Sequence, residues 1–282
     1  MDSHIEDVRS HDYDSSIRPP YVAEDRINYE FTLILRLFME PVNPPAGQQT
    51  FRTPDHSGTL WPALRWTRAA WLDFTGKYTE LVSRVWDKAF LLIPPANFDG
   101  FLWPPGGKRR KLLCRLRIKI QDSADNAHTR IKLVRLASPT KSSFRSNSGL
   151  YDSDDVTLQR VTWKEGTSFL HNTPAHEVGH LLGLWHSGSG DEKCCADQGS
   201  HDCYGSNLYE RMNVMGGGGM LDLENSWPWR IRVPFHTSRG RMADWKAEWA
   251  SSEAQLRGLD GLEVEERFKK PYVAPKPGMI DL

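Results

Sequence analysis

The sequence predicts an α+β fold, because segments with the two-residue period of a strand alternate along the chain with segments of helical period. Residues 27–38 are the clearest strand, since apolar side chains occupy every second position from Tyr29 to Leu37. Residues 78–89 place apolar side chains three, four, seven and eight positions apart, which predicts an amphipathic helix packed on a sheet. Residues 173–186 combine leucines with three histidines and predict a second helix.

Other segments extend this pattern on both sides of the second helix. Residues 112–120 and 130–136 alternate apolar and basic side chains, which predicts strands with one wet face, and residues 156–163 predict a further strand. The basic side chains indicate a solvated sheet surface rather than a nucleic-acid interface, because the 36 basic and 36 acidic residues of the chain cancel. Residues 237–256 predict a C-terminal helix, since their apolar residues fall on one helical stripe.

The two ends of the chain have the composition of extended segments. Residues 1–26 are polar and predict a flexible arm, and residues 261–282 predict an extended tail. The N-terminus lacks the apolar core of a signal peptide, and no run reaches the roughly 18 apolar residues of a membrane span. We therefore expect no membrane span, and either a cytoplasmic location or export by a leaderless route.

The most informative motif is segment 176–186, which has the pattern His-Glu-x-x-His-x-x-Gly-x-x-His. On a helix, His176 and His180 lie one turn apart on the same face, so both imidazoles can reach one metal ion. Glu177 points about 100° further round the helix, where its carboxylate can hold a water molecule without binding the metal. Gly183 can take a positive φ and end the helix, and the turn that follows brings in His186 as a third ligand.

The flanks of the motif carry their own helix signals. Thr173 has the residue type of an N-cap, and Pro174 fits the first helical position. Leu181, Leu182 and Leu184 supply the apolar side that buries the helix. These features predict that the motif lies on a helix, as the metal site requires.

The motif resembles the zinc-binding sequence of the metzincin clan of zinc metallopeptidases. That resemblance implies a methionine turn beneath the metal, and Met215 in segment 211–216 stands 29 residues after His186 in a suitable sequence. It also implies a catalytic domain over residues 27–260. The upper subdomain, 27–186, would hold a twisted mixed sheet, a backing helix and the zinc helix, and the mostly irregular lower subdomain, 187–260, would hold the methionine turn and the C-terminal helix.

The resemblance further implies a zinc-dependent endopeptidase that hydrolyses peptide bonds of a protein or peptide substrate. One catalytic zinc ion held by three neutral imidazoles keeps its full charge and lowers the pKa of a bound water towards about 7. Glu177 is expected to accept the proton of that water and to pass it to the leaving amine.

Two further parts of the site are less closely defined by the sequence. Trp227 and Trp229 are expected to line the pocket for the substrate side chain beyond the scissile bond. Metzincins often have a tyrosine soon after the methionine that supports the oxyanion, but glycines follow the methionine here. Tyr204, Tyr209 and His201 are therefore only candidates for that role.

Three cysteines cluster between the histidine motif and the methionine turn. Cys194, Cys195 and Cys203 have three interpretations: a disulfide such as Cys195–Cys203, a second metal site with neighbouring acidic residues and histidine, or free thiols. The spacing alone leaves these alternatives open. Cys114 lies within a predicted strand and is expected to be a buried apolar residue.

Three other functions remain open at this point. A zinc amidase with a narrow peptide or cell-wall substrate would use the same residues. A zinc-binding interaction module without proteolysis would not need Glu177, and a structural zinc is usually closed by a fourth protein ligand. The chain is also consistent with a delivered toxin or effector, for which we would expect a cognate inhibitor or immunity protein.

Overall fold

The computed structural model describes most of the chain between Asp7 and Gly258. The described residues are 7–8, 10–18, 27–48, 50–52, 60–96, 98, 110–137, 144, 146–163, 167–188, 201–237 and 241–258. The predicted tail, residues 261–282, lies outside them. Among the helices of these segments, none combines the length and the apolar composition that crossing a membrane requires.

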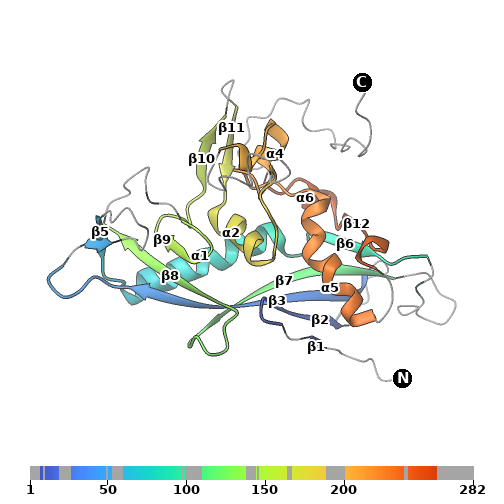
Figure 1. Ribbon diagram of the computed structural model, residues 1–282, viewed down its shortest axis with the longest axis horizontal. Coiled ribbons are helices and arrows are strands. Elements are labelled where there is room, and N and C mark those ends of the chain that lie inside the picture. Colours follow the sequence, from blue (N-terminus) through green and yellow to red (C-terminus); the bar gives the residue numbers. More distant parts are fainter. Residues whose placement is uncertain are drawn as a thin grey trace.

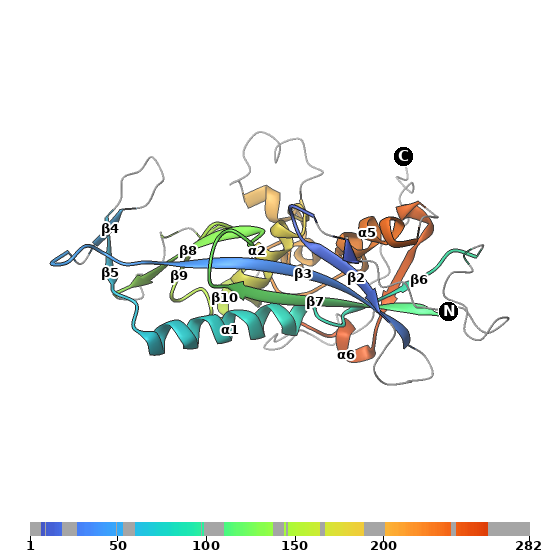
Figure 2. The same cartoon turned by 90° about the horizontal axis from the view of Figure 1, so that it is seen from below.

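The described part of the chain forms a mixed sheet of ten strands, which confirms the predicted α+β class (Figures 1 and 2). Strand β3 (Ile27–Val42) is central: β7 (Lys111–Gln121) runs parallel along one edge of it and β8 (Thr129–Leu136) runs parallel along the other. The order of the main path is β12-β6-β7-β3-β8-β5-β4. The other strands of this sheet are β1 (Asp7–Val8), β2 (Asp14–Arg18), β4 (Thr50–Arg52), β5 (Leu60–Leu64), β6 (Phe90–Ile93), β9 (Leu150–Asp152) and β12 (Lys246–Trp249).

The long helix α1 (Arg68–Trp86) runs lengthwise along the strands (Figure 2). It begins at Arg68, ten residues before the predicted segment 78–89. The preceding residue, Thr67, is the N-cap, and its side chain accepts a hydrogen bond from the Ala70 amide at 3.2 Å. Its apolar stripe and the alternate residues of β3 share one core, in which Phe31, Leu33, Leu35, Leu37, Tyr78, Val82 and Trp86 are fully buried. The apolar face of the helix and the apolar face of the strand therefore pack together in one hydrophobic core.

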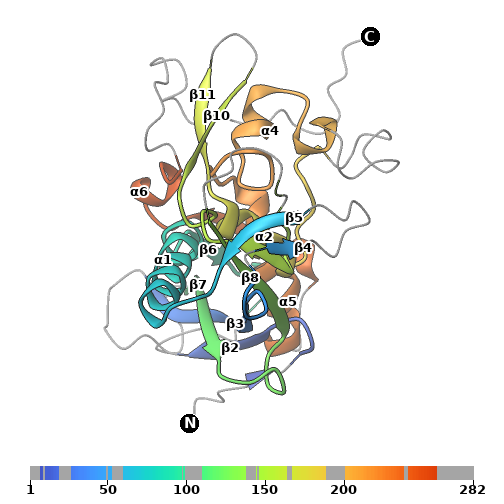
Figure 3. The same ribbon diagram turned by 90° about the vertical axis from the view of Figure 1, so that its left-hand side faces the viewer.

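A separate hairpin leads into the histidine-bearing helix. Strand β10 (Gln159–Thr162) pairs with β11 (Ser168–His171) and projects from the body of the molecule (Figures 1 and 3). Helix α2 (Thr173–Leu181) follows directly and packs against α1. The other helical segments are η2 (His201–Tyr204), α4 (Leu208–Met212), η3 (Leu223–Ser226), α5 (Trp227–Thr237), η4 (Met242–Asp244) and α6 (Ser252–Gln255).

The prediction of a flexible arm over residues 1–26 is wrong for its described centre. Strand β2 pairs antiparallel with β3, and Tyr13 and Ile17 are buried in the main core. Tyr13 also donates a hydrogen bond through its hydroxyl to the Pro228 carbonyl at 3.4 Å. This segment is ordered because its few apolar side chains find partners far along the chain, which a local polar composition does not reveal.

The predicted helix over residues 237–256 is also wrong. A helix ends at Thr237, and the following chain forms η4, strand β12 and the short helix α6. Strand β12 is the edge strand of the sheet and pairs antiparallel with β6, with Trp249 opposite Phe90. Two of the apolar residues that suggested a helical stripe therefore have other roles: Trp249 belongs to this edge pairing, and Trp245 is fully buried in the core.

We predict that Trp86 is a main support of α2. Its ring is fully buried, and its Nε1–H donates to the Ala175 carbonyl at 2.9 Å. Trp86→Leu should lower the free energy of unfolding by about 3–5 kcal/mol, because a large cavity opens. Trp86→Phe, which keeps a ring but loses the donor, should cost about 1–3 kcal/mol. Urea unfolding measures both.

Trp185→Leu is the matched control, because the Trp185 side chain is 72% exposed. Its free energy of unfolding should stay within about 0.5 kcal/mol of the unsubstituted chain. Equal losses at positions 86 and 185 would contradict the supporting role of the buried tryptophan.

Candidate metal centre

Helix α2 begins at a side-chain cap one residue earlier than the sequence suggests. Asn172, and not Thr173, is the N-cap: its Oδ1 accepts a hydrogen bond from the Ala175 amide at 3.1 Å. Thr173 is the first helical residue, and Pro174 lies in the first turn, where no intrahelical partner for its nitrogen is needed. The cap therefore fixes where the first histidine of the motif emerges.

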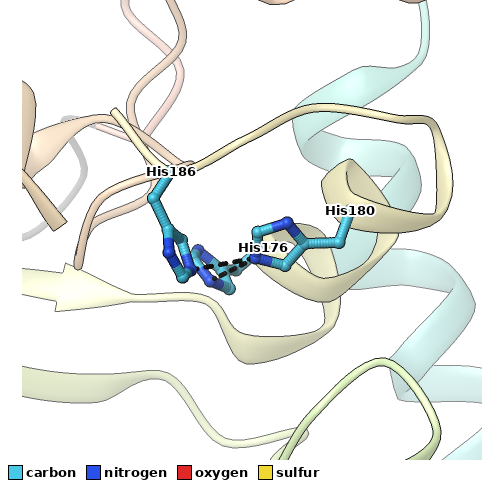
Figure 4. Close-up of side chains that lie close together, drawn as sticks. All are labelled: His176, His180 and His186. Atoms are coloured by element: carbon cyan, nitrogen blue, oxygen red, sulfur yellow. Dashed lines mark hydrogen bonds between the residues drawn. The ribbon is translucent and has the colours of Figure 1, made fainter. Parts of the chain in front are cut away.

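The structure brings His176, His180 and His186 together (Figure 4). The Nε2 atom of His180 lies 3.2 Å from Nε2 of His176 and 3.0 Å from Nε2 of His186. Two of these rings project from α2, and the third comes from the chain beyond the helix. Three nitrogen atoms at these separations form a group that could hold a metal ion.

Hydrogen bonds at the opposite ring nitrogens set the direction of two imidazoles. Nδ1 of His176 lies 2.6 Å from the Val214 carbonyl, and Nδ1 of His180 lies 2.9 Å from the Leu184 carbonyl. A carbonyl oxygen only accepts, so Nδ1 carries the hydrogen in each ring and Nε2 is left with a lone pair. Burial lowers the pKa of all three histidines, that of His186 to about 4, which keeps them neutral.

The third histidine reaches the site because the helix stops. Helix α2 ends at Leu181, and Gly183 has a φ of 88°, which confirms the positive φ predicted for it. A Cβ at this position would also lie 3.2 Å from the Trp227 ring. Backbone conformation and close packing together favour glycine at the turn that directs the chain to His186.

Glu177 lines the same cavity as His176. The cavity has a volume of about 880 Å³. The Glu177 side chain is largely buried, and burial together with the charge of Asp155 raises its pKa to about 8. A bound dication would reverse this effect, because a nearby positive charge favours the carboxylate.

The cavity is also lined by acidic residues that the motif did not indicate. Asp152, Asp154 and Asp155 line the cavity, and Asp155 is only 3% exposed. Oδ2 of Asp155 accepts hydrogen bonds from the Ser146 hydroxyl at 2.5 Å and the Asp152 amide at 2.7 Å. Burial and the charge of Asp152 raise the pKa of Asp155 to about 7. The run of acidic residues was visible in the sequence, but its place in the cavity depends on β9 and the turn after it.

His171 is a second residue that the motif did not indicate. It lies at the end of β11, lines the cavity, and its ring is 5.5 Å from that of His176 in an edge-to-face arrangement. Burial lowers its pKa to about 4. Helical spacing could not have identified His171, because it lies on a strand and not on the helix of the motif.

Met215 lies beneath the histidine helix. A Cβ built on Gly179 of α2 would lie 2.2 Å from the Met215 sulfur, so the helix and the methionine are in direct contact only because position 179 is glycine. The Met215 carbonyl accepts a hydrogen bond from the Ser187 amide at 3.0 Å, next to the third histidine. The turn thus contacts both parts of the chain that carry the histidines.

Asn213 organises this turn, and sequence reasoning missed it. Its Oδ1 accepts from the Met215 amide at 2.8 Å, as in an Asx turn. Its Nδ2 donates to Asp222 at 2.9 Å and to Asn225 at 3.1 Å. The asparagine two residues before the methionine was the available signal, whereas its two acceptors are contributed by a later segment.

Neither of the two tryptophans expected at a substrate pocket lines this cavity. Trp229 is fully buried, packs near Trp86 and Phe90, and donates to the Arg115 carbonyl at 3.1 Å, so its assignment to the pocket is wrong. Trp227 is half-buried against Gly183 and is not among the residues that line the cavity.

Of the three oxyanion candidates, Tyr204 is placed at the histidines, where it lines the cavity. Tyr209 packs instead with the small cluster of Phe169, Met212 and Met220. The side chain of His201 lies outside the described residues.

The cysteine predictions are partly resolved. Cys203 is buried and disulfide-bonded. Cys194 and Cys195 lie outside the described residues, so the specific pair Cys195–Cys203 stays a prediction. Cys114 is a buried free thiol, as expected from its strand, and burial raises its pKa.

Comparison with known proteins gives no match: no protein-family model, no curated protein and no solved structure is similar to this chain.

We predict that Gly179→Ala disturbs the contact between α2 and Met215. The added Cβ would overlap the methionine sulfur and lie 3.3 Å from the Trp86 ring, so buried side chains must move. The free energy of unfolding should fall by about 1–3 kcal/mol. Gly76→Ala is the matched control, because Gly76 lies on the exposed face of α1 and its added Cβ would meet nothing within 4 Å. This variant should be more stable than the unsubstituted chain by about 0.5–1 kcal/mol, because alanine is the better helix former. Thermal or urea unfolding distinguishes the two, and a stabilised Gly179→Ala variant would refute the contact.

We predict that Asp155 makes the metal-free protein less stable as the pH rises. Its pKa is about 7 in the fold against an ordinary value of 3.8, so the folded state holds a proton that the unfolded chain releases. The free energy of unfolding should therefore fall between about pH 4 and pH 7. Asp155→Asn removes this dependence, and its advantage over the unsubstituted chain should be about 4 kcal/mol larger at pH 8 than at pH 4.

Urea unfolding at the two pH values, with the metal removed, measures that difference. Asp73→Asn is the matched control, since Asp73 is exposed and paired only with Lys77 on α1. Parallel pH curves for Asp155→Asn and the unsubstituted chain would show that the Asp155 carboxyl is not held protonated.

Proposed function

We propose that this chain is a zinc-dependent endopeptidase of the metzincin type, with Glu177 as its general base. The observation that carries the proposal is the group of three histidines that could hold a metal ion, together with the cavity that His176 and Glu177 both line. Neither the ligand group nor the carboxylate alone would indicate hydrolysis. Together they place a metal ligand set and a proton acceptor beside the same space.

The geometry of the donor atoms fits zinc. Tetrahedral zinc with bonds of about 2.0–2.1 Å to imidazole nitrogen requires ligand nitrogens about 3.3–3.4 Å apart. The Nε2 atom of His180 lies 3.2 Å from that of His176 and 3.0 Å from that of His186, close to this requirement. The Nε2 atoms of His176 and His180 both carry lone pairs and have no hydrogen to share between them, so a cation is the group that suits the space.

The number of protein ligands favours catalysis over a structural role. Structural zinc sites are usually closed by four protein ligands, whereas catalytic sites leave a position for water or substrate. In the described part of the chain, the group that could hold a metal consists of three histidines and no fourth side chain. One member of the group, His176, lines a cavity, which supports access for a substrate.

Each residue then has a defined task. His176, His180 and His186 bind zinc, which when present supplies the Lewis acidity that polarises a peptide carbonyl and activates water. The Glu177 carboxylate accepts a proton at one oxygen and delivers it to the amine that leaves. Burial of this carboxylate keeps its proton affinity high and limits competing contact with bulk water.

The function is tested by a cleavage map of a denatured proteome, with the zinc-loaded chain beside zinc-loaded Glu177→Gln. The unsubstituted chain should cut peptide bonds, and the variant should lose about 10²–10⁴-fold in turnover, because its amide cannot accept the proton. Zinc content should stay at one ion per chain in both, as measured by metal analysis.

Glu80→Gln serves as the matched control, since Glu80 lies exposed on α1 and does not line the cavity. It should cleave at the rate of the unsubstituted chain. Equal cleavage by the Glu177 and Glu80 variants would refute the general base. Zinc binding without any cleavage would refute the endopeptidase and favour a narrow amidase or a binding module.

A further inference from the structure

The ring of Tyr204 lies against two of the three histidines. Its centroid is 4.4 Å from that of His186, with 36° between the ring planes, and 5.8 Å from that of His176, with 24° between the planes. Tyr204 also lines the cavity that contains Glu177. Tyr204 belongs to η2, which is separate from helix α2 and from the turn that contains Met215.

His186 needs such a contact more than its two neighbours do. Backbone carbonyls orient the rings of His176 and His180 through Nδ1, but among the described residues no carbonyl accepts from Nδ1 of His186. His186 also lies beyond the end of α2, so no helical backbone restricts its position. Ligand rings in metal sites are normally fixed by a group outside the metal's own coordination.

We propose that Tyr204 is a positioning residue of the metal centre, whose ring holds the His186 imidazole with Nε2 directed at Nε2 of His180. The inference rests on the proposed function only in taking the three-histidine group as a metal site. The ring acts through its face. Its contribution therefore requires the aromatic ring but not the hydroxyl group.

The backbone on both sides of Tyr204 is fixed, as a positioning role requires. Cys203 is buried and disulfide-bonded, and its carbonyl accepts a hydrogen bond from the Gly188 amide at 2.9 Å. That amide lies two residues beyond His186. The same bond therefore ties the segment of the tyrosine to the segment of the histidine.

On the other side, the Gly205 carbonyl accepts from Nε of the buried Arg211 at 2.6 Å. The Arg211 guanidinium in turn lies 4.3 Å from the centre of the Trp163 ring. These contacts hold η2 independently of the histidines. Because η2 is held in place by these contacts, the Tyr204 ring offers a fixed surface that can orient His186. A ring on an unsupported loop would instead move with the histidine.

The test is the zinc dissociation constant of the full chain, measured by competition with a chromophoric chelator. Tyr204→Leu should weaken zinc binding by about tenfold, because a ligand-orienting contact is lost. Tyr204→Phe should stay within about twofold, since it keeps the ring. Tyr209→Leu, the same change at a tyrosine packed elsewhere, should leave the affinity unchanged. The Co²⁺-loaded protein should show an altered visible absorption spectrum in Tyr204→Leu and not in Tyr204→Phe.

A double-mutant cycle with His186→Ala separates positioning from general stability. If Tyr204 acts through His186, Tyr204→Leu should have no further effect on zinc affinity in the His186→Ala chain. An equal loss in both backgrounds would overturn the proposal, as would unchanged affinity and an unchanged Co²⁺ spectrum in Tyr204→Leu. An equal loss in Tyr204→Phe and Tyr204→Leu would overturn it too, by assigning the role to the hydroxyl. Should Tyr204→Leu not fold, Tyr204→Met provides the same comparison.

These readouts are independent of peptide cleavage. A chain whose zinc affinity depends on the Tyr204 ring, but which cuts no peptide, would uphold this inference and refute the endopeptidase. If the unsubstituted chain cuts peptides and Tyr204→Leu keeps full zinc affinity, the endopeptidase is upheld and this inference is refuted. Absence of zinc binding in the unsubstituted chain would overturn both.

Discussion

The hydrogen bond between Nδ1 of His176 and the Val214 carbonyl is the interaction on which the site depends. It joins two residues 38 positions apart and fixes the tautomer that leaves the His176 Nε2 lone pair free. The next carbonyl, that of Met215, accepts from the Ser187 amide beside the third histidine. The turn that contains Val214 and Met215 therefore orients the His176 ring directly. It also fixes the backbone next to His186 through Ser187.

Burial acts on the two kinds of titratable group in the site in opposite chemical directions but with one consequence. It lowers the pKa of the histidines and raises the pKa of Glu177 and Asp155, so it favours the neutral form of both kinds in the metal-free chain. Neutral histidines are ready to bind a cation. The carboxyl groups regain their charge when a dication is close, so metal binding and the basicity of Glu177 are coupled through the cavity that Glu177 and His176 both line.

Local sequence signals predicted the parts of the molecule that local forces determine. The period of β3, the spacing of the histidines and the positive φ of Gly183 need only neighbours within a few residues. The failures share the opposite property: β2 and β12 are ordered by pairing with strands distant in sequence, and His171 and Asp155 reach the cavity through a hairpin and a turn. Asn172 displaced Thr173 as the cap because the end of β11 determines where the helix can begin.

The position of Trp229 in the core, and not at the cavity, separates two requirements of the site: a polar cavity and a closely packed support for the histidines. A substrate pocket rich in tryptophan would have made the cleft apolar, but Trp86 and Trp229 are both fully buried in the core, where Trp86 supports the start of α2. The cavity wall is instead largely polar, with aspartates, His171 and Arg160 among its residues. The proposed hydrolysis would need water at the metal, whereas the geometry of the histidines needs a dry and closely packed support. Helix α2 serves both needs with nine residues, since His176 and Glu177 line the cavity while Gly179 and Ala175 contact the aromatic core.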